Sequence, residues 1–184
     1  MKNLEIEYKV MISKEDFIKL DSLIFKKKYK YYEQTNYYYD TINNDLKTNN
    51  YSLRIRHIEN LNKYIITLKI PEIIGKMEYE YEIDSLSLNN VPQKIVEKLS
   101  EINVTVNNLE LKGSLKTIRK EIVIDNSIVC LDLNTYNNNE DYEIECESSS
   151  MEKAKQIINT LLNKYGVSYI PSKYSKVARA LKNH

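Results

Sequence analysis

Strict alternation of hydrophobic and polar residues runs through most of the chain and predicts a protein built mainly from β-strands. Seven segments show this alternation, namely residues 3–11, 52–58, 63–70, 77–84, 117–124, 128–134 and 141–147, and residues 36–40 are a shorter eighth candidate strand. Within residues 77–84, for example, large apolar side chains alternate with acidic ones along the whole segment. Each predicted strand therefore has one apolar face, suited to a core, and one polar face that in most strands is charged.

Apolar residues at helical spacing predict helices between these strands. The predicted helices cover residues 13–28, 91–101, 151–165 and a last segment from about residue 172. Ser13 and Ser150 are suitable N-caps, and Gly166 is suited to end the third helix. Because most strands follow one another with short connections, the sequence predicts an α+β fold. We expect a closed eight-stranded antiparallel β-barrel with helices packed on the outside.

Composition favours one folded domain over residues 1–184, because 42% of the residues are hydrophobic and 29% are charged. With 27 basic and 26 acidic residues the formal net charge is +1, so we expect no DNA partner. No apolar run approaches the roughly 18–20 residues that cross a bilayer. The charged N-terminus does not resemble a signal peptide, so we expect a cytoplasmic protein with no membrane partner. Nothing in the sequence indicates the oligomeric state.

Two cysteines, Cys130 and Cys146, fall in predicted strands. By alternation their side chains point to opposite faces, so they do not suggest a disulfide framework. We expect both thiols to be reduced.

Acidic and basic residues are segregated by strand. Acids repeat at every second position in residues 78–82 and 143–147, whereas bases dominate residues 54–56. A solvated face explains charges on any single strand of an antiparallel sheet. However, carboxylates about 7 Å apart along a strand repel one another unless positive charge lies among them. Strand-wise segregation therefore favours a binding site over a merely solvated surface.

Clustered carboxylates bind hard divalent cations such as Mg²⁺ or Mn²⁺, and Arg and Lys side chains bind phosphate oxygens. If the charged faces line the inside of one barrel, acids on some strands and bases on others describe a site for a metal-chelated polyphosphate. The sequence therefore predicts chemistry on phosphate chains.

The segment Glu5-Ile6-Glu7-Tyr8-Lys9 resembles the ExExK signature of the CYTH domain, the family of triphosphate tunnel metalloenzymes. Further segments agree with the family in order: Leu53-Arg54-Ile55-Arg56, Thr67-Leu68-Lys69, Glu78-Tyr79-Glu80-Tyr81-Glu82, Arg119, Asp132, Glu143-Ile144-Glu145-Cys146-Glu147, and Ser172-Lys173-Tyr174-Ser175-Lys176 with Arg179. The resemblance spans essentially the whole chain. ExExK alone would be a weak signal, whereas the ordered set is a strong one.

This resemblance implies an eight-stranded tunnel, Mg²⁺ or Mn²⁺ as the cofactor, and a triphosphate-bearing small molecule as the partner. It implies metal ligands among Glu5, Glu7, Asp132, Glu143 and Glu145. The implied phosphate-binding residues are Lys9, Arg54, Arg56, Lys69, Arg119, Lys173, Lys176 and Arg179. The acids Glu78, Glu80, Glu82 and Glu147 would support the site. The catalytic candidates are Glu5, Glu7, Lys9 and Glu145.

We interpret the protein as a divalent-metal-dependent hydrolase of triphosphates, with inorganic tripolyphosphate as the leading substrate and metal-activated water releasing orthophosphate. Three alternatives stay open: a thiamine triphosphatase, a class IV-type adenylate cyclase that releases pyrophosphate from ATP, and a noncatalytic nucleotide- or polyphosphate-binding module. The chain lacks the His-Phe pair that those cyclases carry before their acidic motif. It also has no Trp, the residue that mammalian thiamine triphosphatases use near the thiamine.

Overall fold

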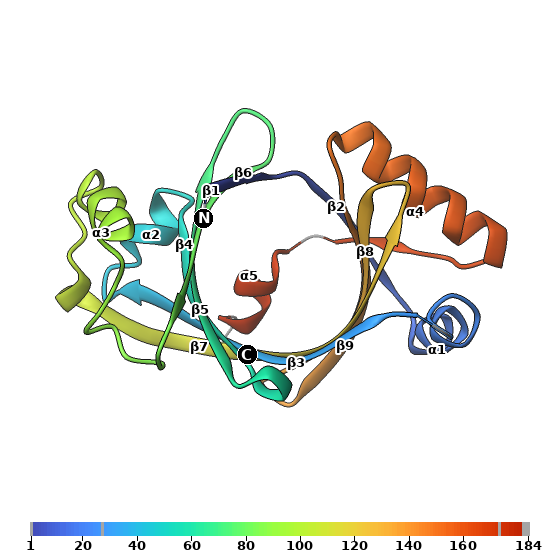
Figure 1. Cartoon of the computed structure of the whole chain (residues 1–184), viewed down its shortest axis with the longest axis horizontal. Coiled ribbons are helices and arrows are strands. Elements are labelled where there is room, and N and C mark those ends of the chain that lie inside the picture. The colour runs from blue at the N-terminus through green and yellow to red at the C-terminus, as the bar shows by residue number, and fades with distance from the viewer. Residues whose placement is uncertain (1, 27, 173, 182–184) are drawn as a thin grey trace. The chain divides into compact units, whose positions relative to one another are not determined.

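The computed structural model describes residues 2–26, 28–172 and 174–181. The predicted phosphate-binding residue Lys173 lies outside the described residues. The chain divides into two compact units. Figure 1 labels helices and strands of both. Among the described residues, unit 1 contains 2–4, 34–115 and 176–181, and unit 2 contains the remainder. Two long strands, β3 (Lys30–Thr41) and β7 (Leu109–Ile124), contribute residues to both units.

Unit 1 is an antiparallel sheet with strand order β1-β6-β5-β4-β3-β7. The bounds of its other strands are β1 (Lys2–Glu5), β4 (Ser52–Ile58), β5 (Lys63–Pro71) and β6 (Lys76–Ile83). Its helices are α2 (Asp45–Thr48), α3 (Gln93–Ser100) and α5 (Lys176–Ala180), with short 3-10 helices at Glu59–Leu61 and Val106–Asn108. Helices α2 and α3 lie on one side of the strands (Figure 1).

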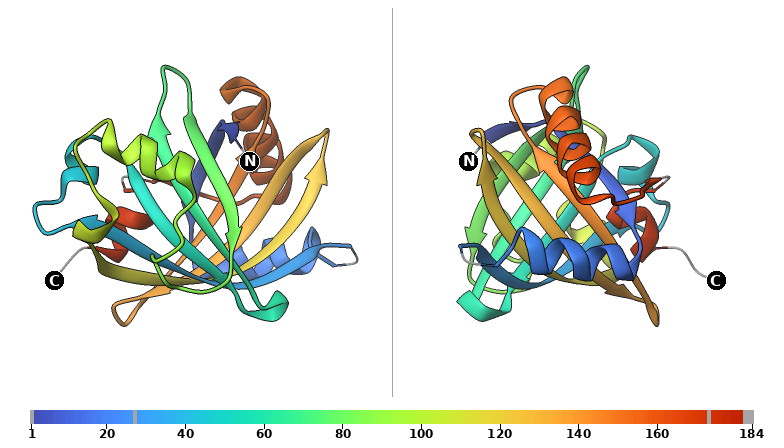
Figure 2. Two further views of the ribbon diagram at one scale, coloured as in Figure 1. Left: turned by 60° about the vertical axis from the view of Figure 1, so that its left-hand side comes forward. Right: turned by 90° about the vertical axis from the view of Figure 1, so that its right-hand side faces the viewer.

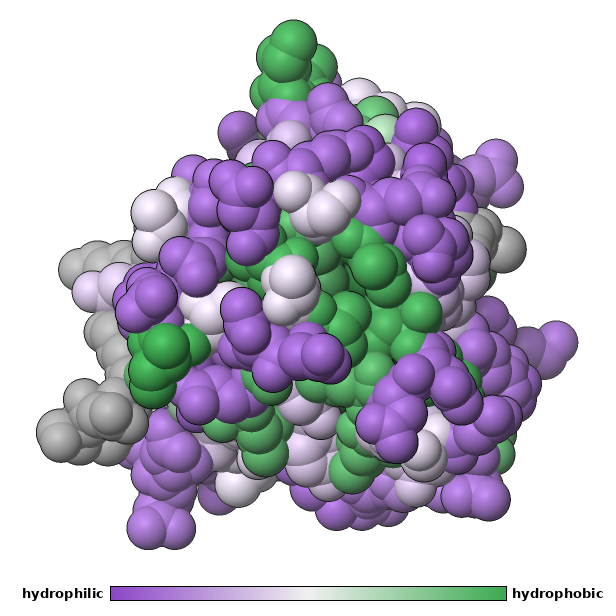
Figure 3. Space-filling view, turned by 90° about the vertical axis from the view of Figure 1, so that its left-hand side faces the viewer, coloured by the Kyte–Doolittle hydropathy of each residue, from purple (hydrophilic) through white to green (hydrophobic). Residues whose placement is uncertain are grey.

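The core of unit 1 lies between this apolar sheet face and α2 and α3. Ile55 and Ile66 are fully buried there, together with Ile95 and Leu99 from one side of α3. Figure 3 shows a hydrophobic area, framed by hydrophilic residues, on the side of the molecule that carries α3. An open hollow of about 560 Å³, lined chiefly by Leu88, Val91, Val96, Val106 and Leu109, lies between α3 and the loops that flank it.

Unit 2 is an antiparallel sheet with strand order β7-β8-β9-β2-β10. The new elements are β2 (Glu7–Ile12), β8 (Ser127–Tyr136), β9 (Asn139–Glu147), β10 (Ile170–Pro171), α1 (Lys14–Leu23) and α4 (Met151–Tyr165). Both helices cross the outer side of these strands (Figure 2). Val10, Leu131 and Ile144 from the sheet are buried against Leu20 of α1 and Ile158 of α4.

Helix ends in unit 2 follow the capping residues in the sequence. The Ser13 and Ser150 side chains accept hydrogen bonds from the backbone N–H groups of Asp16 and Lys153. Gly166 ends α4 in the left-handed conformation, with φ of 58°. The predicted helix over residues 13–28 is too long, because α1 ends at Leu23 and the apolar run continues with Phe25 buried in the core outside the helix.

The fold prediction is confirmed for the α+β class and the antiparallel strands, but the last predicted helix, α5, lies on the other side of the unit 1 strands from α2 and α3. The described part of the chain has ten strands instead of eight, because the N-terminal strand divides at Ile6 and β10 is added. Strands β1 and β10 each have one hydrogen-bonded neighbour, so a closed eight-stranded barrel is not confirmed. The last helix starts at Lys176 rather than near residue 172, because Pro171 belongs to the extended β10. No helix within the described ranges is long and apolar enough to cross a membrane.

Candidate functional site

Strand register places the charged residues of unit 2 in rows across its polar face. Glu143 on β9 is opposite Asp132 on β8, and Asp132 is opposite Arg119 on β7. In the next row Glu145 lies between Lys9 on β2 and Cys130 on β8. Directly opposite residues of antiparallel strands share a face. The alternation read from the sequence therefore brings residues more than 100 positions apart onto one surface.

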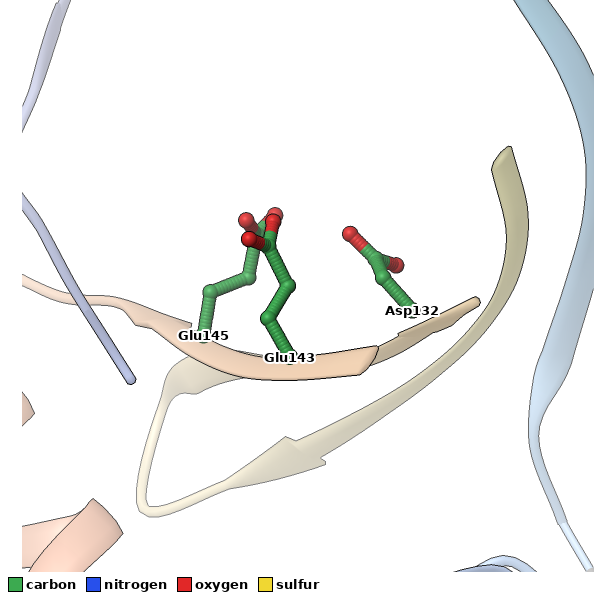
Figure 4. Close-up of side chains that lie close together, drawn as sticks. All are labelled: Asp132, Glu143 and Glu145. Atoms are coloured by element: carbon green, nitrogen blue, oxygen red, sulfur yellow. The ribbon is translucent and has the colours of Figure 1, made fainter. Parts of the chain in front are cut away.

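Three carboxylates converge on this face (Figure 4). Asp132, Glu143 and Glu145 are all buried, and one ligand oxygen from each lies within 4.8 Å of the others. Figure 4 shows their carboxylate groups gathered above β8 and β9. Carboxylate oxygen is the donor that Mg²⁺ and Mn²⁺ prefer, so the donor set fits a hard divalent cation.

Arg119 supplies positive charge beside these acids. Its Nε donates to Asp132 Oδ1 at 2.8 Å and its Nη2 to Asp132 Oδ2 at 2.7 Å. Nη2 also bonds to Glu145 Oε1. Burial by itself lowers the Arg119 pKa, but the charge of Asp132, with smaller contributions from Cys130 and Glu145, raises that pKa well above its ordinary value. The guanidinium therefore stays charged among the carboxylates.

Glu7 and Lys9 of the N-terminal motif lie on β2, the strand that pairs with β9. Lys9 Nζ bonds to Glu7 Oε1 at 2.6 Å, and Glu7 is opposite Glu147 in the register. Glu5 is the last residue of β1. Within the described residues, the set of three converging carboxylates includes neither Glu5 nor Glu7. Their assignment as metal ligands stays a prediction from the motif.

Unit 1 carries the predicted basic strand on its own polar face. Arg54 is opposite Thr67 and Thr67 is opposite Glu80, so a cation, a hydroxyl and an acid form one row. Arg56 Nε donates to Asn36 Oδ1 at 3.0 Å. Arg54 Nε is buried and has no hydrogen-bond partner among the described residues. A buried guanidinium N–H without an acceptor is costly, and an anionic ligand would satisfy it.

Lys69 and the acids of β6 complete this face. Lys69 Nζ lies 2.5 Å from Glu78 Oε1. Burial favours the neutral Glu78 acid, but the positive charges of Lys69, Arg54 and Arg56 outweigh it and lower the Glu78 pKa. Glu80 Oε2 accepts a hydrogen bond from Thr67 Oγ1 at 3.3 Å, and Glu82 bonds to Lys63 at the surface. Glu78 therefore pairs with Lys69 and lies among the cations of this face.

Helix α5 belongs to unit 1 and lies on the other side of its strands from α2 and α3 (Figure 1). Lys176 is its first residue, and Arg179 is buried. A Cβ atom at Gly113 on β7 would lie 3.1 Å from the backbone oxygen of Ala180, so the glycine allows α5 to approach the strand closely. The structure therefore places two of the three predicted helix cations on the helix that packs against β7.

Sequence reasoning missed Asn36 as a member of the site. It is almost fully buried on β3, and it orients Arg56. Residues 34, 36, 38 and 40 are all buried, so the inward face of β3 carries polar and aromatic side chains. The sequence marked residues 36–40 only as a short candidate strand, and the uncharged side chain of Asn36 gave no reason to assign it to the site.

Comparison with known proteins identifies the family. A family model for the CYTH domain matches residues 3–181. "Putative triphosphatase YjbK" of Bacillus subtilis (strain 168) is 31% identical over 168 residues, which covers 89% of this chain and 87% of YjbK. The solved structure of a "putative adenylate cyclase" from Bacillus halodurans has 31% identity and a TM-score of 0.86, with 98% of this chain and 99% of that chain covered. A structure of "Putative adenylyl cyclase HpAC1 from Hippeastrum" has 26% identity and a TM-score of 0.79, with coverages of 95% and 94%. The chain is therefore a member of the CYTH domain family.

Proposed function

We propose that this protein is a divalent-metal-dependent hydrolase of triphosphates, with inorganic tripolyphosphate as its leading substrate. The observation that carries the proposal is the convergence of Asp132, Glu143 and Glu145 on one buried point beside Arg119. Carboxylate oxygen is the donor that Mg²⁺ and Mn²⁺ prefer, so this cluster fits a divalent cation. The predicted phosphate-binding cations of unit 1 agree with the same chemistry.

The carboxylates of Asp132, Glu143 and Glu145 would hold the metal, with Glu5 and Glu7 as further candidates from the motif. A bound Mg²⁺ or Mn²⁺ supplies positive charge for phosphate oxygens and lowers the pKa of coordinated water. The protein's part is to hold the carboxylates correctly spaced. The neighbouring Arg119 guanidinium contacts two of them, Asp132 and Glu145.

Cationic side chains bind the phosphates in this proposal. Arg54 contributes a buried Nε–H that lacks an acceptor, and Arg56 is oriented by Asn36. Further cations are Lys9, Lys69, Arg119, Lys173, Lys176 and Arg179. Such groups neutralise the charge on the phosphoryl oxygens in the transition state, which is the main contribution that a protein makes to phosphoryl transfer.

Two relatives favour hydrolysis over cyclisation. YjbK carries the name of a triphosphatase, and the description of the Hippeastrum structure reports "a dominant triphophatase activity" for a protein named as a cyclase. Both are similar to this chain over most of its length. A cyclase would also need an adenine pocket, and the sequence identifies none.

A product-resolved assay tests the proposal. Purified protein is incubated with tripolyphosphate, ATP, thiamine triphosphate or pyrophosphate, each with Mg²⁺ or Mn²⁺. We expect orthophosphate release from tripolyphosphate that EDTA abolishes. Glu143→Gln should reduce kcat by about 100-fold or more, because it removes one charged ligand. Glu152→Gln is the matched control, because this acid lies in the first turn of α4.

Each other outcome selects an alternative. Pyrophosphate released from ATP alone would favour the cyclase, and a preference for thiamine triphosphate would change the substrate. Metal-dependent binding without turnover, measured by calorimetry, would favour a noncatalytic binding module.

A further inference from the structure

Arg119 forms hydrogen bonds with two of the carboxylates that we propose as metal ligands. Its guanidinium forms a two-pronged contact with both oxygens of Asp132, at 2.8 and 2.7 Å, and it also bonds to Glu145. Two of the three converging acids are therefore already bound to a cation that belongs to the protein. All of these residues lie in unit 2, on the adjacent strands β7, β8 and β9.

A guanidinium and a metal ion on the same carboxylate repel each other. The planar fork of Arg119 uses one oxygen of Asp132 for each of its two N–H groups, which leaves that carboxylate directed at the arginine. A divalent cation binds the same oxygen atoms at shorter distances. Coordination by Asp132 and Glu145 therefore favours the loss of at least part of the Arg119 contacts.

The arginine also explains how the free protein tolerates the cluster. Asp132 and Glu143 are fully buried, and buried carboxylates close together repel strongly unless a cation lies among them. Lys9, the other cation in these rows, is opposite Glu145 and bonds to Glu7. Arg119 contacts Asp132 directly.

We propose that Arg119 is an internal counter-ion. It binds the metal-ligand carboxylates in the metal-free protein and releases them when the metal binds. The proposal rests on the proposed function, because it assumes that this cluster binds the divalent cation. Once released from Asp132, the guanidinium has free N–H donors for a phosphate oxygen. Metal and triphosphate then assist each other's binding, since thermodynamic linkage is reciprocal.

Removal of the counter-ion should increase the affinity of the protein for metal alone. Binding of Mn²⁺ can be followed by the loss of the electron paramagnetic resonance signal of free Mn²⁺, without any substrate. We expect Arg119→Gln to bind Mn²⁺ about tenfold more tightly than the wild type, or tighter still, because directly contacting charge pairs couple at least this strongly. Equal or weaker Mn²⁺ binding by a folded Arg119→Gln protein would overturn the proposal.

Lys120→Gln is the matched control. Lys120 is the next residue on β7 and carries the same charge, but its Nζ bonds to Asp21 on α1, so it lies on the other face of the strand. The same loss of charge there should change Mn²⁺ affinity by less than about twofold, because Lys120 is paired with Asp21 on the other face of the strand. A similar gain in both variants would mean that net charge alone sets the affinity, which contradicts the proposal.

A second measurement uses the wild type and so does not depend on the folding of a variant. The Arg119 Nε–H resonance, assigned by its loss in Arg119→Lys, should shift on titration with Mg²⁺ as the bond to Asp132 breaks. A resonance that does not move while Mg²⁺ saturates the protein would also overturn the counter-ion role. Phosphate release by the same wild-type sample separates the two proposals. Activity without a shift of the Arg119 resonance would support the hydrolase proposal and reject only the counter-ion proposal.

Discussion

Lys69 Nζ and Glu78 Oε1 lie 2.5 Å apart on the polar face of unit 1, and each side chain is about seven-eighths buried. The two residues are direct partners in the register of β5 and β6. A charge pair at this depth is shielded from water far better than the surface pairs of α3, so the loss of either partner would leave an uncompensated buried charge.

Low pH should reduce the stability of unit 1 by protonating Glu78. Its pKa is lowered because Lys69, Arg54 and Arg56 outweigh the effect of burial. A carboxyl with a lowered folded-state pKa contributes stability above its ordinary pKa of about 4.3, and the contribution is lost as the pH falls through the lowered value. We expect the free energy of unfolding, measured in urea, to fall more steeply below about pH 5 in the wild type than in Glu78→Gln. Glu82→Gln, on the same strand but bonded at the surface, should follow the wild type.

Arg54 should act on substrate affinity. Its buried Nε–H has no acceptor in the described structure, so a phosphate oxygen would gain a charge-assisted hydrogen bond at little cost in protein rearrangement. We expect Arg54→Gln to raise the KM for tripolyphosphate by about 10- to 100-fold, the value of one hydrogen bond between charged groups. Steady-state kinetics would measure it, with Lys94→Gln on α3 as a control of equal charge. An unchanged KM would remove Arg54 from the phosphate-binding set.

The two thiols should be inert in the folded protein. Cys130 and Cys146 are buried free cysteines on opposite faces of their strands, as the alternation predicted. Burial raises the pKa of Cys146 to about 11, and it raises the pKa of Cys130 as well. At pH 8 we expect both to react with a disulfide reagent about 100-fold more slowly than in guanidinium chloride, because little thiolate is present. The Cys146 rate should still be rising at pH 10, and a plateau near pH 8.5 would contradict the raised pKa.

The sequence predicted unit 2 best where local rules and packing agree. Strands β8 and β9 alternate regularly, and Ser150 and Gly166 mark both ends of α4. The short helix α2 was missed because its position depends on Asp40, whose carboxylate accepts hydrogen bonds from the backbone N–H groups of Leu46 and Lys47. Such a contact leaves no periodic pattern.

Pairing between distant strands explains the remaining differences. The two residues of β10 are too few to alternate, and their strand exists because Ile170 pairs with Met11. The acids were recognised as one chemical class from the sequence, but only the register separates Glu143 and Glu145, which meet Asp132, from Glu78, which pairs with Lys69. Alternation assigns a face, whereas strand register determines which residues of that face become neighbours.

Gly113 controls how closely α5 approaches β7. A methyl group there would lie 3.0 Å from Leu181 Cδ2 and 3.1 Å from the Ala180 backbone oxygen. The leucine side chain can rotate away, but the backbone oxygen moves only if the helix moves. We expect Gly113→Ala to destabilise the protein by about 1–3 kcal/mol. It should also speed hydrogen exchange of the α5 amides, because the helix has only five residues and depends on this contact. Ser114→Ala, the exposed neighbour on β7, is the control for both measurements.

If α5 carries phosphate-binding cations as we propose, Gly113→Ala should raise the KM for tripolyphosphate while kcat changes less. Faster α5 exchange with an unchanged KM would show that Lys176 and Arg179 do not bind substrate.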